Sequence, residues 1–110
     1  MATFAIQDRS YACPVELSLS VVGGKWTALV LWHLRGGTRR YSEIRRAMPG
    51  ITHKMLAQRL RELEADGLVH RKVYPVVPPH TEYTLTREGE RMVPALEAMQ
   101  RWGMRYKTEG

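Results

Sequence analysis

The sequence predicts a mainly helical α+β domain, and three observations lead to this fold class. Two segments with apolar residues at helical spacing, 42–48 and 53–66, are separated only by a short, glycine-containing turn. Residues 68–86 then change to an alternating pattern interrupted by prolines, which predicts a β-hairpin. Two helices joined by a tight turn and followed by a hairpin form a winged helix-turn-helix. The length of 110 residues is typical of one domain, so we expect residues 1–110 to form a single unit.

Two further helices are expected before this motif. Residues 1–12 lack a clear periodicity and are expected to form an N-terminal arm. Cys13-Pro14 opens a helix over 13–24, because proline suits the first helical position, and Gly23-Gly24 ends it. A broadly apolar helix follows over 25–35 and is expected near the middle of the core. The inward-facing residues of the two helices are expected to be Leu17, Val21, Val22, Trp26, Leu29, Val30 and Leu34.

The two helices of the helix-turn-helix carry capping signals. Ser42 is the predicted N-cap of helix 42–48, and Thr52 is that of the following helix. Ile51 and a leucine in the first turn can form a hydrophobic staple. Gly67 provides the left-handed stop at the other end. The expected core residues of the pair are Ile44, Met48, Leu56, Leu60 and Leu63.

The remaining chain is expected to form the wing and a long last helix. Strands are predicted over 68–74 and 81–86, on either side of a proline-rich turn. Thr86 caps a helix over 86–107, and Pro94 inside it is expected to kink the axis. An apolar stripe of this helix contains Met92, Leu96, Met99 and Tyr106, flanked by Trp102.

The net charge is concentrated in one part of the chain. Lys and Arg number 17 against 11 Asp and Glu, a net charge of +6. Residues 35–74 hold ten basic and four acidic residues, which accounts for the whole excess. Such asymmetry predicts a surface that binds an anionic partner, nucleic acid or, less often, lipid headgroups. A plain solvated face is the alternative.

The outward face of the helix after Thr52 can read DNA. When its leucines face the core, a rotation of about 100° per residue places Lys54, Gln58 and Arg61 on the opposite side. Lys and Arg can contact guanine or phosphate, and Gln can pair with adenine. Thr52 and His53 lie at the helix N-terminus, which favours a phosphate. The alternative is an ordinary amphipathic surface helix. The hairpin and the localised charge disfavour it.

Other basic residues near the motif are expected to contact the DNA backbone. Arg59 lies nearer the core edge and suits the backbone better than a base. Arg71, Lys72 and His80 on the hairpin suit a wing that touches a neighbouring groove or phosphate. The other predicted phosphate contacts are Arg39, Arg40, Arg45 and Arg46.

Several classes of function are disfavoured. One cysteine and four histidines without ligand spacing predict no metal, and no cofactor is expected. The sequence contains no Ser–His–Asp constellation, glycine-rich phosphate loop or carboxylate pair, so no enzyme activity is predicted. The N-terminus lacks a signal-peptide pattern, and no apolar run nears the roughly 20 residues of a membrane span. A cytoplasmic protein without membrane contact is therefore expected.

A series of different short motifs extends from Cys13 to Gly103, over nearly the whole chain. They are Cys13-Pro14, Gly23-Gly24-Lys25-Trp26-Thr27, Arg40-Tyr41-Ser42-Glu43-Ile44, residues 50–56, residues 59–64, Asp66-Gly67-Leu68, residues 74–79, Tyr83-Thr84-Leu85-Thr86, Gly89 and Trp102-Gly103. In this combination the chain resembles the HxlR-type family of bacterial winged helix-turn-helix transcriptional regulators. Tyr41 stands where the family often has Phe.

The resemblance implies a transcriptional regulator that binds double-stranded DNA sequence-specifically, as a homodimer on an operator with twofold symmetry. In such families the terminal helices build the dimer, here the helices expected over 13–24 and 86–107. Packing on the protein's own core is the alternative for the same residues. Repression and activation are equally compatible with the sequence. The expected interface residues are Leu17, Val21, Met92, Leu96, Met99, Trp102 and Tyr106.

Cys13 is a candidate redox-sensing residue. Some members of the family sense oxidants or electrophiles through an N-terminal cysteine, and Cys13 matches that position. As the N-cap residue it would lie where the helix dipole favours a thiolate, so an oxidant or small molecule is a candidate effector. The alternative is a small structural residue in the dimer helix.

A winged helix that binds only proteins is the rival function. Its basic residues would then serve an acidic partner. A basic face on the second helix of the motif disfavours this reading.

Overall fold

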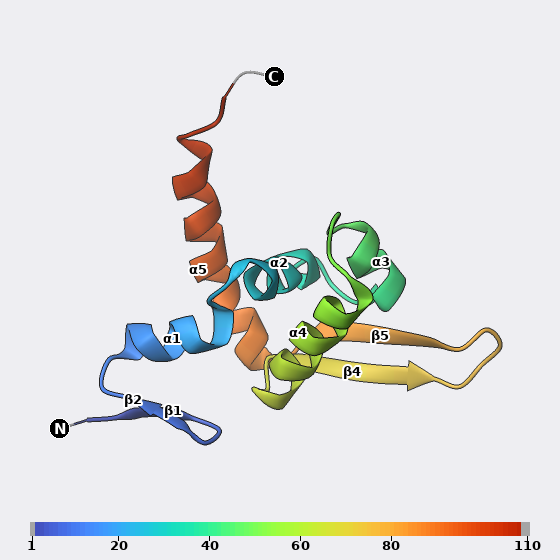
Figure 1. The fold of residues 1–110 in the computed structure, drawn as a ribbon, viewed down its shortest axis with the longest axis horizontal. Coiled ribbons are helices and arrows are strands. Elements are labelled where there is room, and N and C mark those ends of the chain that lie inside the picture. The colour runs from blue at the N-terminus through green and yellow to red at the C-terminus, as the bar shows by residue number, and fades with distance from the viewer. Residues whose placement is uncertain (1, 109–110) are drawn as a thin grey trace.

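The computed structural model describes residues 2–108 and confirms the winged helix-turn-helix (Figure 1). The motif itself consists of α3, the short turn after it and α4, with the wing formed by β4 and β5. In chain order the elements are β1 (Phe4–Ile6), β2 (Arg9–Tyr11), α1 (Pro14–Val22), α2 (Lys25–Leu34), β3 (Arg39–Arg40), α3 (Tyr41–Arg46), α4 (His53–Ala65), β4 (Val69–Tyr74), β5 (His80–Leu85) and α5 (Arg87–Met104).

The leucine stripe of α4 forms the centre of the core. Leu56, Leu60 and Leu63 are at most 1 % exposed, as the spacing predicts. They share one cluster with fully buried residues of α2, such as Val30 and Leu34, and with Ile44 of α3. Burying one leucine side chain stabilises a fold by about 1.5–3 kcal/mol, so this stripe fixes which face of α4 points inward.

The ends of α4 are set by local signals. The Thr52 hydroxyl accepts a hydrogen bond from the Met55 N–H at 3.1 Å, which confirms the predicted N-cap. Ile51 is buried directly before it, as a hydrophobic staple requires. Gly67, at φ 82°, follows the last turn in the left-handed conformation that glycine adopts without strain.

The predicted start of α3 is wrong. The N-cap is Arg40, and Ser42 lies inside the first turn. The Glu43 carboxylate accepts a hydrogen bond from the Arg40 N–H at 2.8 Å, the return bond of a capping box. Arg39 and Arg40 also pair with β5 as β3, so the extended chain leads directly into the helix.

The wing strands β4 and β5 belong to a three-stranded antiparallel sheet in the order β3-β5-β4. β4 and β5 pair from Val69 opposite Leu85 to Tyr74 opposite His80. The end near α4 and α5 is buried at Val69, Tyr83 and Leu85, whereas the far end extends into solvent (Figure 1). The sheet is thus anchored at its base and free at its tip.

The N-terminal segment, expected as an arm over residues 1–12, contains a β-hairpin that the sequence does not predict. β1 and β2 form an antiparallel hairpin whose turn contains Gln7 at φ 55°. Arg9 forms an ion pair with Asp66 at 3.0 Å, and the Gln7 side-chain amide donates to the Ala65 carbonyl at 2.5 Å. The hairpin therefore rests on the C-terminus of α4. Strands of three residues carry too little pattern to be predicted, and their contacts lie 57 and 58 residues away.

α5 begins on the core and ends outside it. The Thr86 hydroxyl accepts a hydrogen bond from the Gly89 N–H at 3.1 Å, which confirms the predicted cap. A side chain at Gly89 would collide with the Leu68 carbonyl, so glycine allows the first turn to approach β4 closely. Pro94 lies within the continuous helix. Beyond the buried Leu96, α5 projects away from the rest of the molecule (Figure 1).

Replacing Leu60 by Ala tests the central position of the α4 stripe. The substitution leaves a cavity in the fully buried core, so we expect the free energy of unfolding to fall by about 2–5 kcal/mol. Urea denaturation at fixed protein concentration measures it. The exposed Lys54→Ala on the same helix is the matched control and should stay within about 0.5 kcal/mol of wild type. Equal losses in the two variants would contradict the assignment of the faces.

Candidate nucleic-acid interface

The outward face of α4 is polar and accessible. Lys54, Gln58 and Arg61 are all exposed, on the side opposite the buried leucines. Thr52 and His53 are exposed at the N-terminus of the helix. The structure therefore brings together the five residues that the sequence places on the reading face.

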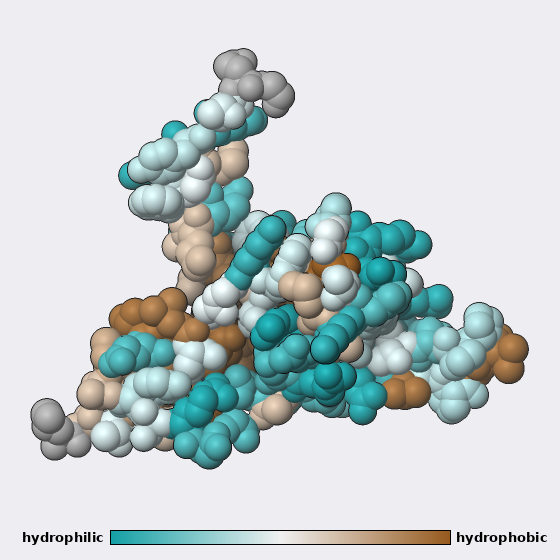
Figure 2. Space-filling model, in the orientation of Figure 1, coloured by the Kyte–Doolittle hydropathy of each residue, from teal (hydrophilic) through white to brown (hydrophobic). Residues whose placement is uncertain are grey.

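Two arginines of α3 flank the N-terminus of α4. Arg45 and Arg46 are exposed in the last turn of α3. They line an open hollow of about 460 Å³ together with Tyr41, Gly50 and His53. Figure 2 shows hydrophilic side chains gathered over α3 and α4 on this face. Guanidinium groups next to a helix N-terminus form a favourable environment for a phosphate.

Tyr41 and His53 form a stacked and hydrogen-bonded pair that the sequence pattern does not predict. Their rings are stacked, with centroids 5.9 Å apart and planes 4° apart. The Tyr41 hydroxyl lies 3.2 Å from His53 Nδ1 and also donates to the His53 carbonyl oxygen at 3.2 Å. The pair connects the start of α3 to the first residue of α4. A spacing of twelve residues across a turn gives no periodic signal.

The wing brings further basic residues to the edge of the face. Arg71 and Lys72 are exposed on β4. Arg71 lies 3.5 Å from Glu64, an ion pair that connects the wing to the C-terminal half of α4. Lys72 lies over the ring of Tyr74 at 4.8 Å. The sequence does not predict this ion pair, because Glu64 and Arg71 lie on different elements and no periodic pattern relates them.

His80 and the wing tip differ from the basic stretch of β4. His80 is half-buried, stacks on Tyr74 at 4.7 Å and lies 3.6 Å from the Glu82 carboxylate. The tip beyond it is apolar, with Val77 99 % exposed and Val76 52 % exposed. Basic groups therefore lie along the strand rather than at the tip.

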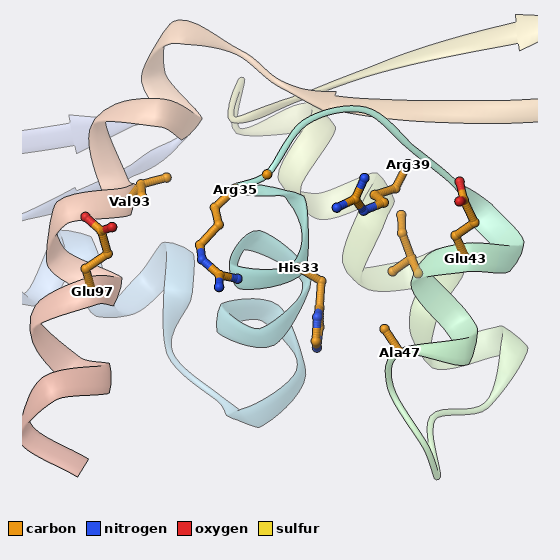
Figure 3. Close-up of a pocket in the computed structure, with 9 residues that line it drawn as sticks. His33, Arg35, Arg39, Glu43, Ala47, Val93 and Glu97 are labelled. Carbon is orange, nitrogen blue, oxygen red and sulfur yellow. The ribbon is translucent and has the colours of Figure 1, made fainter. Parts of the chain in front are cut away.

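Two predicted contacts, Arg59 and Arg39, lie apart from this cluster, whereas Arg40 does not. Arg59 is half-buried and pairs with Glu62 at 2.6 Å, which leaves its guanidinium partly neutralised. Arg40 is exposed at the N-cap of α3. Arg39 instead lines a hollow of about 550 Å³ to which α2, α3 and α5 contribute but α4 does not (Figure 3).

The hollow that contains Arg39 holds charges of both signs. Arg35 and His33 come from the end of α2, Glu43 from α3 and Glu97 from α5 (Figure 3). Burial lowers the pKa of His33, and the neighbouring Arg35 and Arg39 lower it further. A neutral His33 leaves two arginines and two carboxylates as the charged groups that line this hollow. The mixed charges do not single out an anionic ligand.

Cys13 occupies the predicted position. It is the N-cap residue of α1, half-buried, and its carbonyl accepts a hydrogen bond from the Leu17 N–H at 3.3 Å. Tyr11, the last residue of β2, is only two residues before it. The thiol therefore lies at the junction between the N-terminal hairpin and α1.

The residues expected at a dimer interface fall into two groups. Val21 and Leu96 are buried within the chain itself, and Leu17 and Met92 are half-buried against its core. Met99 and Trp102 on the projecting part of α5, and Tyr106 just after its C-terminus, are 58–67 % exposed. Val15 and Leu19 add exposed apolar area on α1, which is coloured as hydrophobic in Figure 2.

Other kinds of site are not found in the part of the chain that the structure describes. Residues 2–108 hold no group of three or more His, Cys, Asp or Glu side chains able to bind a metal ion. Within the same residues, no helix combines the length and apolarity that a membrane crossing needs.

Comparison with known proteins places these features in a family. The HxlR-like helix-turn-helix profile matches residues 21–110. An uncharacterised HTH-type transcriptional regulator of Methanothermobacter thermautotrophicus is 50 % identical over 99 residues, 90 % of this chain and 76 % of that protein. The redox regulator HypR in its oxidised form has a TM-score of 0.82 at 47 % identity, over 88 % of this chain and all of that chain. HypR in its reduced form gives 0.81 at 48 %, over 84 % and 92 %. The chain belongs to the HxlR-like helix-turn-helix family of transcriptional regulators.

Proposed function

We propose that the chain regulates transcription as a homodimer that binds a specific double-stranded DNA operator in the cytoplasm. One observation carries the proposal: an exposed polar face of α4, opposite its buried leucines, lies between the arginines of α3 and the basic strand of the wing. A DNA major groove admits one α-helix, and phosphates line both of its edges. The three parts of the surface fit those three parts of the duplex.

The residues of this surface have distinct proposed roles. Gln58 can form paired hydrogen bonds with adenine, and Arg61 and Lys54 can bind guanine or phosphate. Arg45 and Arg46 contact the backbone beside the N-terminus of α4, and no acidic side chain within 4 Å pairs with either among the described residues. The list of proposed contacts is completed by Thr52, His53, Arg40, Arg71, Lys72 and His80, with Arg39 and Arg59 at the margin.

The dimer is proposed to form through α1 and the projecting half of α5. Met99 and Trp102 at the end of α5, together with Tyr106 just after it, are mostly exposed and leave unburied apolar area that a second copy can cover. Val15 and Leu19 of α1 enlarge that area. A symmetric pair of subunits would place the two α4 helices about 34 Å apart, one turn of DNA.

A response to oxidants through Cys13 is the second part of the proposal. HypR, similar over most of its length, is by its description a redox regulator. In this chain the only cysteine lies between α1, a proposed dimer helix, and a hairpin that contacts the C-terminus of α4. A covalent change at Cys13 can therefore alter both the subunit pairing and the position of α4. A disulfide would have to join two subunits or a small thiol.

Alanine substitutions separate base contacts from phosphate contacts. Gln58→Ala or Arg61→Ala should cost about 1–3 kcal/mol of binding at particular base pairs, while Arg46→Ala should weaken all sequences alike. Fluorescence anisotropy with the selected site and with single base-pair substitutions measures both effects. A uniform loss for Gln58→Ala would contradict its assignment, and a protein-only function would leave no DNA preference to lose.

Introducing a charge into the exposed part of α5 tests the dimer. Trp102→Asp buries a charge in the proposed interface, so the subunits should dissociate at micromolar concentration. Sedimentation velocity measures the mass. Val77→Asp, at an even more exposed apolar residue on the wing tip, is the control and should leave the dimer intact. A Trp102→Asp variant that sediments like wild type places the interface elsewhere.

Thiol modification tests the redox response. Titration with an oxidant or an alkylating reagent should release the wild-type protein from DNA in step with loss of the single thiol. Cys13→Ser should remain bound throughout. Anisotropy and a parallel thiol assay follow the two events, and release that persists in Cys13→Ser rejects the sensor role.

A further inference from the structure

The Tyr41–His53 pair restricts which hydrogen-bonding group α4 presents at its N-terminus. The Tyr41 hydroxyl lies 3.2 Å from two atoms of His53, its ring Nδ1 and its carbonyl oxygen. A hydroxyl has one proton to donate and lone pairs that can accept. The carbonyl oxygen can only accept, whereas Nδ1 can donate or accept, depending on the tautomer. Both contacts are satisfied together only when the hydroxyl donates to the carbonyl and Nδ1–H donates to the hydroxyl.

This arrangement fixes the tautomer of the neutral ring. A neutral imidazole has one N–H, so a proton on Nδ1 leaves Nε2 as an acceptor. The stacking of the two rings, with planes only 4° apart, holds the imidazole in this orientation. His53 is exposed, so its ring is accessible from solvent and from a duplex docked on α4.

We infer that Tyr41 is a positioning residue that makes His53 a hydrogen-bond acceptor for an exocyclic amino group in the major groove. The inference rests on the proposed function and adds a base-reading residue to it. Cytosine N4 and adenine N6 are the amino groups that the major groove offers. Guanine and thymine present acceptors there, so they cannot donate to Nε2. A phosphate, which needs a donor, is left to Arg45 and Arg46 at the same hollow.

The first measurement addresses the tautomer without DNA. Long-range ¹H–¹⁵N correlation of the histidine rings at pH 8, where imidazole is ordinarily neutral, identifies the protonated nitrogen. His53→Ala assigns the signals. We expect Nδ1–H in the wild type and a shift toward Nε2–H in Tyr41→Phe, which keeps the ring and removes the hydroxyl.

The chain offers a matched control. Tyr74 also stacks on a histidine, His80, with centroids 4.7 Å apart, and no hydrogen bond joins its hydroxyl to that ring among the described residues. Tyr74→Phe should therefore leave both histidine tautomers unchanged. Nε2–H at His53 in the wild type, or the same tautomer in Tyr41→Phe, overturns the inference.

The second measurement addresses the base. Sites selected from random duplexes by the wild type should hold cytosine or adenine at one position opposite His53, and each of the other bases there should weaken binding about three- to tenfold. The identity of the selected base separates the two amino groups. His53→Ala and Tyr41→Phe should each lose that preference, and combining them should lose nothing more.

The outcomes separate this inference from the proposed function. If the wild type binds selectively and His53→Ala and Tyr41→Phe keep the same base preferences, the inference is overturned and the proposed function is not. A loss that is equal on all sequences means a phosphate contact and also overturns it. A wild type that binds every duplex alike overturns the proposed function and, with it, the reading of a base by His53, whichever tautomer is observed. Circular dichroism checks that both variants fold, since His53 is exposed and the half-buried Tyr41 keeps its ring in Tyr41→Phe.

Discussion

The packing of the α4 leucines against α2 and α3 is the constraint on which the rest of the structure depends. A helix with Leu56, Leu60 and Leu63 fully buried has only one orientation available, because rotating it would expose all three at once. The same packing holds Lys54, Gln58 and Arg61 outward. The residues that stabilise the core and the residues proposed to bind DNA therefore lie on opposite faces of α4, and no residue belongs to both sets.

Three contacts with other segments hold α4 in place relative to the rest of the fold. Tyr41 joins α3 to the first residue of the helix, Glu64 joins the wing to its second half, and Asp66 receives Arg9 from the N-terminal hairpin. The Asp66 side chain is only 8 % exposed, less than any other side chain in the ion pairs of the described residues. α4 is therefore held at its beginning, along its length and at its end by segments distant in sequence. Cys13 follows closely in sequence after Arg9, which forms the last of these contacts.

Local patterns in the sequence predicted the elements that local physics determines. Thr52, Gly67 and the leucine spacing set the limits and the buried face of α4, and the structure confirms each. The N-terminal hairpin could not be predicted, because its short strands are held by Arg9 and Gln7 through contacts across more than half the chain. The N-cap of α3 was predicted at Ser42 because serine is a common capping residue. The N-cap is Arg40, whose N–H donates to Glu43 and which also pairs with β5, and a contact with β5 has no local pattern in the sequence. Arg39 belongs to the same short strand, β3, and lines the hollow formed by α2, α3 and α5 and not the α4 face.

Methylation interference can show whether two copies of α4 enter successive major grooves of one duplex, as we propose. Methyl groups on guanine N7 lie in the major groove, so they block a helix there. On a duplex that contains the selected site, we expect two symmetric clusters of interfering guanines with centres about 10–10.5 base pairs apart. A single cluster, or binding that tolerates methylation throughout, would contradict it.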